Sequence, residues 1–363
     1  MPVELTTLTD GGQPATRVAA EIARFLNDAR TSLDLALYDV RLETEAGALV
    51  LAALLAADQR GVRVRLVYDV SHPGPIPVPP PPETRPEAIE ALPVDTRGIP
   101  GIPDLMHHKF CVRDGTDVWT GSMNWTEDSW TRQENVVVRV PGAARLAYAF
   151  TLCFDQLWET GIVQGSGNVE PRPVELEGGV TVRPWFTPGN GEALSHRVAK
   201  HIGRAKRRIR FASPVLTAGP ILGTLAEVVA ERRCDVAGVI DDTQIDDVFR
   251  QWQANEVSAW KIPLLHAIVT SASFAGKASV PWRRDGVQNF MHAKVVVADE
   301  VSFVGSYNFS RSGERNAENV LEIADPATAD VLARYIDEVR ERYPPATPPD
   351  VRAGAVTDPE RVS

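Results

Sequence analysis

Two stretches of this chain combine residue types that could act together on a phosphate ester. Each stretch has a His, a Lys two residues later and an Asp seven residues after the His, followed by Gly-Ser-x-Asn and then Glu-Asn. The first copy contains His107, Lys109, Asp114, Ser122, Asn124 and Glu134, and the second contains His292, Lys294, Asp299, Ser306, Asn308 and Glu318. A lone His-x-Lys would mean little, but a repeated pattern of this length points to a catalytic site.

The chemistry that these residues could perform is displacement at phosphorus. A phosphodiester is a stable anion, so a catalyst must neutralise its charge and protonate the leaving oxygen. One neutral His can attack phosphorus while a second, protonated His supplies the proton and later activates water. Lys109 and Lys294 can hold the non-bridging oxygens as point charges, and Asn124 and Asn308 can donate further hydrogen bonds. Each copy offers one such His, so the two halves of the chain must face each other.

The two copies resemble the His-Lys-Asp motifs of the phospholipase D superfamily of phosphodiesterases. The first copy, through Thr120–Thr126, is most similar to the branch of short bacterial nucleases and mitochondrial cardiolipin hydrolases. The resemblance implies a covalent phosphohistidine, with His107 as the nucleophile and His292 as the acid/base, although the sequence is symmetric on this point. It implies that Glu134 and Glu318 orient the histidines. No metal or cofactor is implied. Supporting roles are expected for Asp114, Ser122, Asp299 and Ser306.

The periodicity of the flanking segments predicts the fold. In each half, alternating apolar segments typical of strands occur between segments with a helical apolar face. The expected strands of the first half lie at 3–9, 32–40, 62–70, 107–112, 118–120 and 135–140, with helices at 16–30 and 43–59 and after 141. The second half repeats this order about 185 residues later. We therefore expect an α/β protein of two similar phospholipase D-like α/β/α sandwich units that form an intramolecular pseudo-two-fold dimer.

Composition shifts divide the chain into parts. We expect an N-terminal unit over 1–163, a linker over 164–179, a C-terminal unit over 180–343 and a disordered tail over 344–363. Residues 71–103 hold 11 of the 28 prolines, which suits an extended loop that either flanks the site or is an inert insertion. The stretch 254–289 has no clear periodicity.

Bulk properties restrict the class of protein. The net charge of −10 argues against a general nucleic-acid coat. Only six of the 38 basic residues are lysines, and two of the six lie in the motifs. The three cysteines have no metal-ligand spacing, the N-terminus has no signal-peptide pattern, and no apolar run is long enough to span a bilayer. We expect a cytoplasmic protein without a transmembrane segment, and a monomer with a pseudo-dimeric active site.

Three functions are compatible with these residues. The leading interpretation is a metal-independent phosphodiesterase that hydrolyses a phospholipid head group or transfers it to another alcohol. The same chemistry would suit a nuclease acting on DNA or RNA. A non-catalytic module that binds nucleic acid or membrane would be expected to have a damaged motif, whereas both motifs are intact. The substrate class depends on loops that the sequence does not define.

Overall fold

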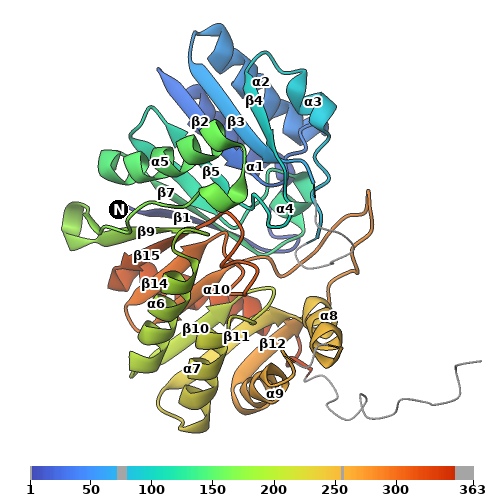
Figure 1. The fold of residues 1–363 in the computed structure, drawn as a ribbon, viewed down its shortest axis with the longest axis vertical. Coiled ribbons are helices and arrows are strands. Elements are labelled where there is room, and N and C mark those ends of the chain that lie inside the picture. Colours follow the sequence, from blue (N-terminus) through green and yellow to red (C-terminus); the bar gives the residue numbers. More distant parts are fainter. Residues whose placement is uncertain (1, 72–79, 255–256, 348–363) are drawn as a thin grey trace, which may run out of the picture.

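In the computed structural model, which describes residues 2–71, 80–254 and 257–347, the chain forms two mixed sheets, one in each half (Figure 1). The first sheet has the order β1-β7-β6-β5-β2-β3-β4, and the second has the order β12-β11-β10-β13-β14-β15-β9-β8. Apart from the short extra strand β8, the two orders correspond strand for strand. The expected fold class, two similar α/β units related by a pseudo-two-fold axis, is confirmed.

The first sheet is covered by helices on both faces. Its strands are β1 (Glu4–Leu8), β2 (Ser32–Leu37), β3 (Arg63–Asp69), β4 (Asp95–Ile99), β5 (Lys109–Arg113), β6 (Asp117–Gly121) and β7 (Asn135–Val140). Its helices are α1 (Ala15–Asn27), α2 (Glu45–Gln59), α3 (Pro86–Glu90), α4 (Glu127–Thr131) and α5 (Ala144–Thr160). Alternate residues of β2 face opposite layers: Leu35 packs in the core with α1 and α2, whereas Ala36 packs in the core with α5.

The second sheet repeats this arrangement. Its strands are β8 (Val174–Glu175), β9 (Thr181–Thr187), β10 (Arg208–Ala212), β11 (Asp235–Asp241), β12 (Ser273–Lys277), β13 (Val295–Ala298), β14 (Val301–Gly305) and β15 (Glu318–Ala324). Its helices are α6 (Gly191–Arg204), α7 (Gly219–Ala230), α8 (Asp242–Gln253), α9 (Lys261–Ser271) and α10 (Pro326–Glu341). Single 3-10 turns, η1 (Val163–Gly165) and η2 (Glu177–Gly179), lie between the halves.

A shared core joins the two halves. Helices α5 and α10 pack in one apolar cluster together with inward-facing residues of both sheets, among them Phe110 and Val295. The Tyr335 hydroxyl on α10 also donates to the Leu8 carbonyl oxygen at 2.8 Å. Two parallel β-bridges, Met106 with Ala317 and Glu134 with Met291, connect the halves beside the two motif histidines. The interface therefore brings the two motifs together.

The structure differs from the sequence-based expectation mainly in the loops. The proline-rich stretch contains α3 and the edge strand β4, and the stretch without periodicity contains α9 and β12. The expected linker includes β8, which pairs with β9. The expected tail is ordered at its start, where Pro345 bridges Ala275 at the sheet edge, while 348–363 lie outside the described residues. Across the described chain, no helix has the length and apolarity needed to cross a membrane.

Candidate active site

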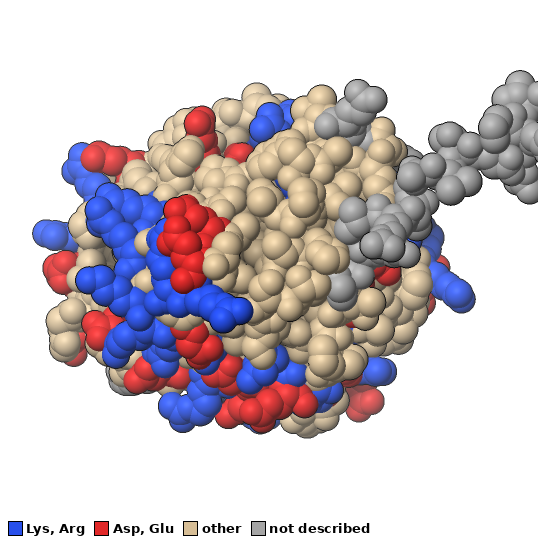
Figure 2. All heavy atoms as spheres, turned by 90° about the horizontal axis from the view of Figure 1, so that it is seen from below, with Lys and Arg blue, Asp and Glu red and all other residues tan. Residues whose placement is uncertain are grey.

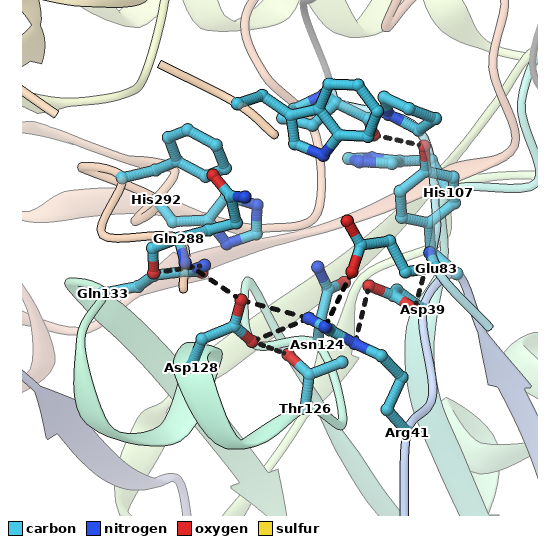
Figure 3. Close-up of a pocket in the computed structure, with 15 residues that line it drawn as sticks. Asp39, Arg41, Glu83, His107, Asn124, Thr126, Asp128, Gln133, Gln288 and His292 are labelled. Carbon is cyan, nitrogen blue, oxygen red and sulfur yellow. Dashed lines mark hydrogen bonds and ion pairs between the residues drawn. The ribbon is translucent and has the colours of Figure 1, made fainter. Parts of the chain in front are cut away.

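His107 and His292 line the same pocket, although they come from different halves of the chain (Figure 3). Both histidines lie just before the motif strands, at the β-bridges that connect the halves, rather than inside the strands as expected. The backbone N–H of His107 donates to the Ala317 carbonyl oxygen at 2.9 Å, and that of His292 donates to the Glu134 carbonyl oxygen at 3.2 Å. Backbone bonds across the interface therefore fix both histidines.

His107 is paired with a carboxylate of the opposite half. Its Nδ1 lies 2.9 Å from each carboxylate oxygen of Glu318, and both side chains are fully buried. Burial, together with Lys109 and Lys294, lowers the pKa of His107 well below its usual range. Burial raises the pKa of Glu318 to about 8 against the opposing effect of Lys109. In its ionised form Glu318 accepts from Nδ1–H, which leaves a lone pair on Nε2, and this Nε2 has no hydrogen-bond partner in the described structure.

His292 is paired with an amide instead of a carboxylate. Its Nδ1 lies 3.0 Å from Asn135 Oδ1. The amide orientation is fixed, because Asn135 Nδ2 donates to the carbonyl oxygen and to Oγ of Ser129 and Ser122 Oγ donates to Asn135 Oδ1. Asn135 Oδ1 must therefore accept from Nδ1–H of His292, which leaves the His292 Nε2 lone pair available. Burial lowers the pKa of His292 as well.

The expectation that Glu134 orients a histidine is wrong. Its carboxylate contacts Lys277 Nζ at 2.8 Å, the Tyr343 hydroxyl and the Asp10 N–H, and none of these belongs to the motifs. The sheet registers give the reason. Val137 pairs with Gly121 in the first sheet, and Val320 pairs with Gly305 in the second, so the two valines are structurally equivalent. Counting back two residues from each valine makes Asn135 the structural equivalent of Glu318, so the two Glu-Asn pairs of the sequence are offset by one residue in the structure.

The two motif lysines are buried, and each contacts the backbone of its motif histidine. Lys109 Nζ donates to the His107 carbonyl oxygen at 2.7 Å, and Lys294 Nζ donates to the His292 carbonyl oxygen at 2.6 Å. Each ammonium group has three N–H donors, so two remain for phosphate oxygens. Burial lowers the pKa of Lys109 to about 7 and lowers that of Lys294 well below its usual range.

The motif asparagines occupy different places. Asn124 lines the pocket of the two histidines, whereas Asn308 lines a different pocket together with Trp252. The Oδ1 atoms of both asparagines are buried and have no hydrogen-bond partner among the described residues. The structure thus brings Asn124 to the pocket of the histidine pair, and it places Asn308 in the lining of another pocket.

The four expected supporting residues hold backbone, and Ser122 also holds the Asn135 amide that faces His292. Asp114 accepts the Thr31 and Ser32 N–H groups at 2.7 and 3.0 Å, and Asp299 does the same for residues 206–208. Burial opposes the ionisation of Asp114, but these donors outweigh it and lower its pKa. Ser122 Oγ and Ser306 Oγ each accept an N–H of the next strand at 3.0 Å.

Two buried aspartates that the sequence did not single out support the histidines. Asp69 ends β3 and accepts the Met106 N–H at 2.8 Å, and Asp241 ends β11 and accepts the Met291 N–H at 2.9 Å. Burial raises the pKa of Asp69 to about 8 and that of Asp241 to about 6. A signal was present in the sequence: each Asp directly follows an apolar strand, at the strand end where sites in α/β sheets lie.

The remaining wall of the pocket is charged. Arg41 contacts Glu83 at 3.0 Å, Asp128 at 2.9 Å and Asp39 at 3.6 Å, and we call these four residues the Arg41 cluster (Figure 3). They come from loops after β2, from the proline-rich stretch and from α4, so no local motif links them. Pro80 and Pro81 also line the pocket, which shows that part of the proline-rich stretch borders the site.

A metal site would need several ligating side chains close together. Over the described ranges, no group of three or more His, Cys, Asp and Glu side chains has a suitable arrangement. Beside the two histidines, the N–H groups of Lys109, Lys294 and Asn124 are donors suited to the oxygens of an anionic ligand.

Comparison with known proteins agrees with this geometry. The family model described as "Cardiolipin synthase, PLD-like domain" matches residues 22–158 and 198–340, one match in each half. The chain belongs to this phospholipase D-like family, within the phospholipase D superfamily.

Individual relatives match either one half or most of the chain. Mitochondrial cardiolipin hydrolase of Xenopus tropicalis is 32% identical over 112 residues, which is 30% of this chain and 47% of that protein. Cardiolipin synthase A of Edwardsiella ictaluri is 27% identical over 303 residues, which is 78% of this chain and 59% of that protein. The chain thus spans about half the length of the curated relatives that it matches.

Among solved structures, phosphatidylserine synthase of Haemophilus influenzae Rd KW20 has the same fold. The TM-score is 0.62 and the sequence identity 14%, and the match covers 94% of this chain and 86% of that chain. This likeness extends across both halves, so it supports the two-unit architecture.

Proposed function

We propose that this protein is a phosphodiesterase of the phospholipase D type that cleaves a phospholipid head group or transfers it to another alcohol. The observation that carries the proposal is the pairing of His107 and His292, one from each half, in a single pocket with a hydrogen-bonded Nδ1 on each ring. Two such rings can serve the attacking and the leaving side of one phosphorus atom.

The environments of the two histidines support different roles. Attack by Nε2 of His107 places positive charge on its ring, and the Glu318 carboxylate at Nδ1 stabilises that charge. We therefore assign His107 as the nucleophile, which forms a phosphohistidine. His292 faces the neutral Asn135 amide, so its ring gives up a proton more readily and suits the acid/base step. Lys109, Lys294 and Asn124 would neutralise the phosphate oxygens.

A phospholipid head group suits this site better than a nucleic-acid strand. The Arg41 cluster sets three carboxylates against one guanidinium at the pocket, which disfavours a polyanion. Residues 200–210 are rich in Lys and Arg, but this segment offers little free positive charge to a polyanion. Three of its arginines, Arg207, Arg208 and Arg210, form ion pairs with Glu300, Asp330 and Asp235. Figure 2 shows positive and negative side chains side by side on the end of the second half. The names of the cardiolipin and phosphatidylserine enzymes point to the same substrate class.

The decisive experiment is parallel turnover of different phosphodiesters by the purified full chain. Phosphatidylethanolamine, phosphatidylcholine, cardiolipin, single-stranded DNA, RNA and bis(4-nitrophenyl) phosphate should be compared with EDTA present. We expect lipid turnover to exceed nucleic-acid cleavage and to be abolished in both His107→Ala and His292→Ala. Nucleic-acid cleavage that exceeds lipid turnover would replace the proposal by a nuclease function, and half the activity in each variant would refute a shared site.

A further inference from the structure

The Arg41 cluster contains more carboxylates than guanidinium groups. One guanidinium faces the carboxylates of Asp39, Glu83 and Asp128, so the formal charge is −2 when all four groups are ionised. All four residues line the pocket of the two histidines. Burial, with Asp128 nearby, raises the pKa of Asp39 in spite of Arg41, and burial likewise raises the pKa of Glu83. Burial is the largest cause of both shifts, and Arg41 offsets it only in part.

Two amide oxygens of the same pocket also lack hydrogen-bond donors. Gln133 and Gln288 are 3% and 5% exposed, and the Oε1 atom of each is buried without a partner in the part of the chain that the structure describes. Their orientations are fixed. Gln133 Nε2 donates to the Gln288 carbonyl oxygen at 3.3 Å, and Gln288 Nε2 donates to the Arg283 carbonyl oxygen at 3.0 Å. Buried acceptors of this kind are uncommon in proteins and mark a place where a donor is missing.

Aromatic side chains complete this wall. Trp282, Phe290 and Tyr38 line the same pocket. Lys109 Nζ already lies 4.7 Å from the Tyr38 ring centroid, which leaves the rings of Trp282 and Phe290 for a ligand. The faces of aromatic rings attract cations. Carboxylates, unpaired acceptor oxygens and aromatic rings together favour a ligand group that is both positively charged and rich in N–H donors.

We infer that this wall binds a primary ammonium group carried by the alcohol portion of the phosphodiester, as in an ethanolamine-type head group. The inference rests on the proposed function, because it assigns the substrate class of the same pocket. A primary ammonium offers three N–H donors to Gln133, Gln288 and the carboxylates. A quaternary ammonium has no N–H donor, and a glycerol head group has no charge. Each of these would leave one of the two requirements unmet.

The first test compares three head groups on identical acyl chains in the same detergent micelles. We expect kcat/KM for phosphatidylethanolamine to exceed those for phosphatidylcholine and phosphatidylglycerol by roughly tenfold or more, the usual cost of leaving buried polar groups unpaired. Equal values for the three lipids, or the highest value for the choline or glycerol lipid, would overturn the inference while leaving the proposed function intact.

A series of variants tests whether the Arg41 cluster causes the preference for the ethanolamine head group. Asp128→Asn and Glu83→Gln should each reduce the ratio of ethanolamine-lipid to glycerol-lipid turnover, and this ratio is insensitive to a partly misfolded preparation. Glu127→Gln is the matched control, because Glu127 precedes Asp128 on α4 but is not part of the lining of the histidine pocket. A ratio that is unchanged in both cluster variants, or that falls equally in the control, would refute the assignment.

A binding measurement tests the inference without turnover. Calorimetry with phosphoethanolamine, phosphocholine and glycerol 3-phosphate compares three ligands that share a phosphate and differ in the attached group. We expect phosphoethanolamine to bind tightest, and its advantage to disappear in Asp128→Asn. If the protein cleaves no phosphodiester but keeps this order, the proposed function fails and the ammonium site stands. If the three ligands bind equally, the ammonium site is refuted.

Discussion

His107 in the first half is oriented by Glu318 in the second half, with Nδ1 2.9 Å from both carboxylate oxygens. His292 has no equivalent carboxylate, since Asn135 occupies the corresponding position. The two halves share a fold, yet the chemistry around their histidines differs. This asymmetry makes the two histidines distinguishable by experiment.

Glu318→Gln should lower kcat strongly. The amide keeps the shape of the side chain but cannot stabilise the positive charge on His107, and it can present a donor to Nδ1. Changes of this kind in histidine–carboxylate pairs cost roughly 10²- to 10⁴-fold in rate. Steady-state kinetics with bis(4-nitrophenyl) phosphate would measure the effect. A loss below threefold would contradict the orienting role.

Glu134→Gln should affect stability more than rate. Glu134 is fully buried and pairs with Lys277, so the substitution weakens a buried ion pair and should cost roughly 1–3 kcal/mol in the free energy of unfolding. Its kcat should fall far less than that of Glu318→Gln, which is the matched change at the other glutamate. Thermal melts and steady-state kinetics on the same preparations would separate the effect on stability from the effect on rate. A larger rate loss for Glu134→Gln than for Glu318→Gln would reverse our assignment.

The His292→Asn variant should accumulate a covalent adduct on His107. A nitrophenyl phosphodiester has a leaving group that needs no proton, so attack can proceed while hydrolysis of the P–N bond is slowed. Mass spectrometry of mildly alkaline digests would locate the adduct on the peptide that contains His107. The reciprocal variant His107→Asn serves as the control. An adduct on His292 in His107→Asn, with none on His107 in His292→Asn, would exchange the two roles.

Phosphate binding should weaken as the pH rises through about 7. Lys109 holds an anion only while protonated, and burial lowers its pKa to about 7, so its charge is present below that pH and is lost above it. The inhibition constant of inorganic phosphate, measured from pH 6 to pH 9, should rise by tenfold per pH unit at most. The exposed Lys200→Met variant should follow the wild type, whereas Lys109→Met should lose the dependence. An unchanged profile in Lys109→Met would exclude Lys109 as the titrating group.

Asp69→Asn should remove a pH-dependent contribution to stability. Burial raises the pKa of Asp69 to about 8 in the folded protein, so between its unfolded pKa and pH 8 the folded state binds the additional proton. Stability from this group is therefore present at low pH and lost as the pH rises through that interval. The difference in Tm between wild type and variant should narrow from pH 5 to pH 8. Asp95→Asn, at an exposed position, should show no such trend.

The sequence by itself determined the family-level architecture and much of the site. The doubled motif marked both histidines and both lysines, because catalytic groups on a strand keep a fixed local spacing whatever surrounds them. Periodicity predicted most helices and strands, among them the helix expected at 43–59, which the structure has as α2 (Glu45–Gln59). Short elements in irregular stretches, such as α9 and β12, were missed because their apolar patterns are brief and are interrupted by polar residues.

Only the tertiary structure decided which groups meet. The partner of each histidine depends on the register of β7 and β15 within their sheets. In β7 a difference of one residue places Asn135, and not Glu134, beside His292. The Arg41 cluster is assembled from three segments far apart in the chain, so no local spacing could encode it. The spacing of motif residues along one segment is a local property that can be read from the sequence. Contacts between strands and loops depend on how whole elements pack. That packing determines which charged side chains line the pocket.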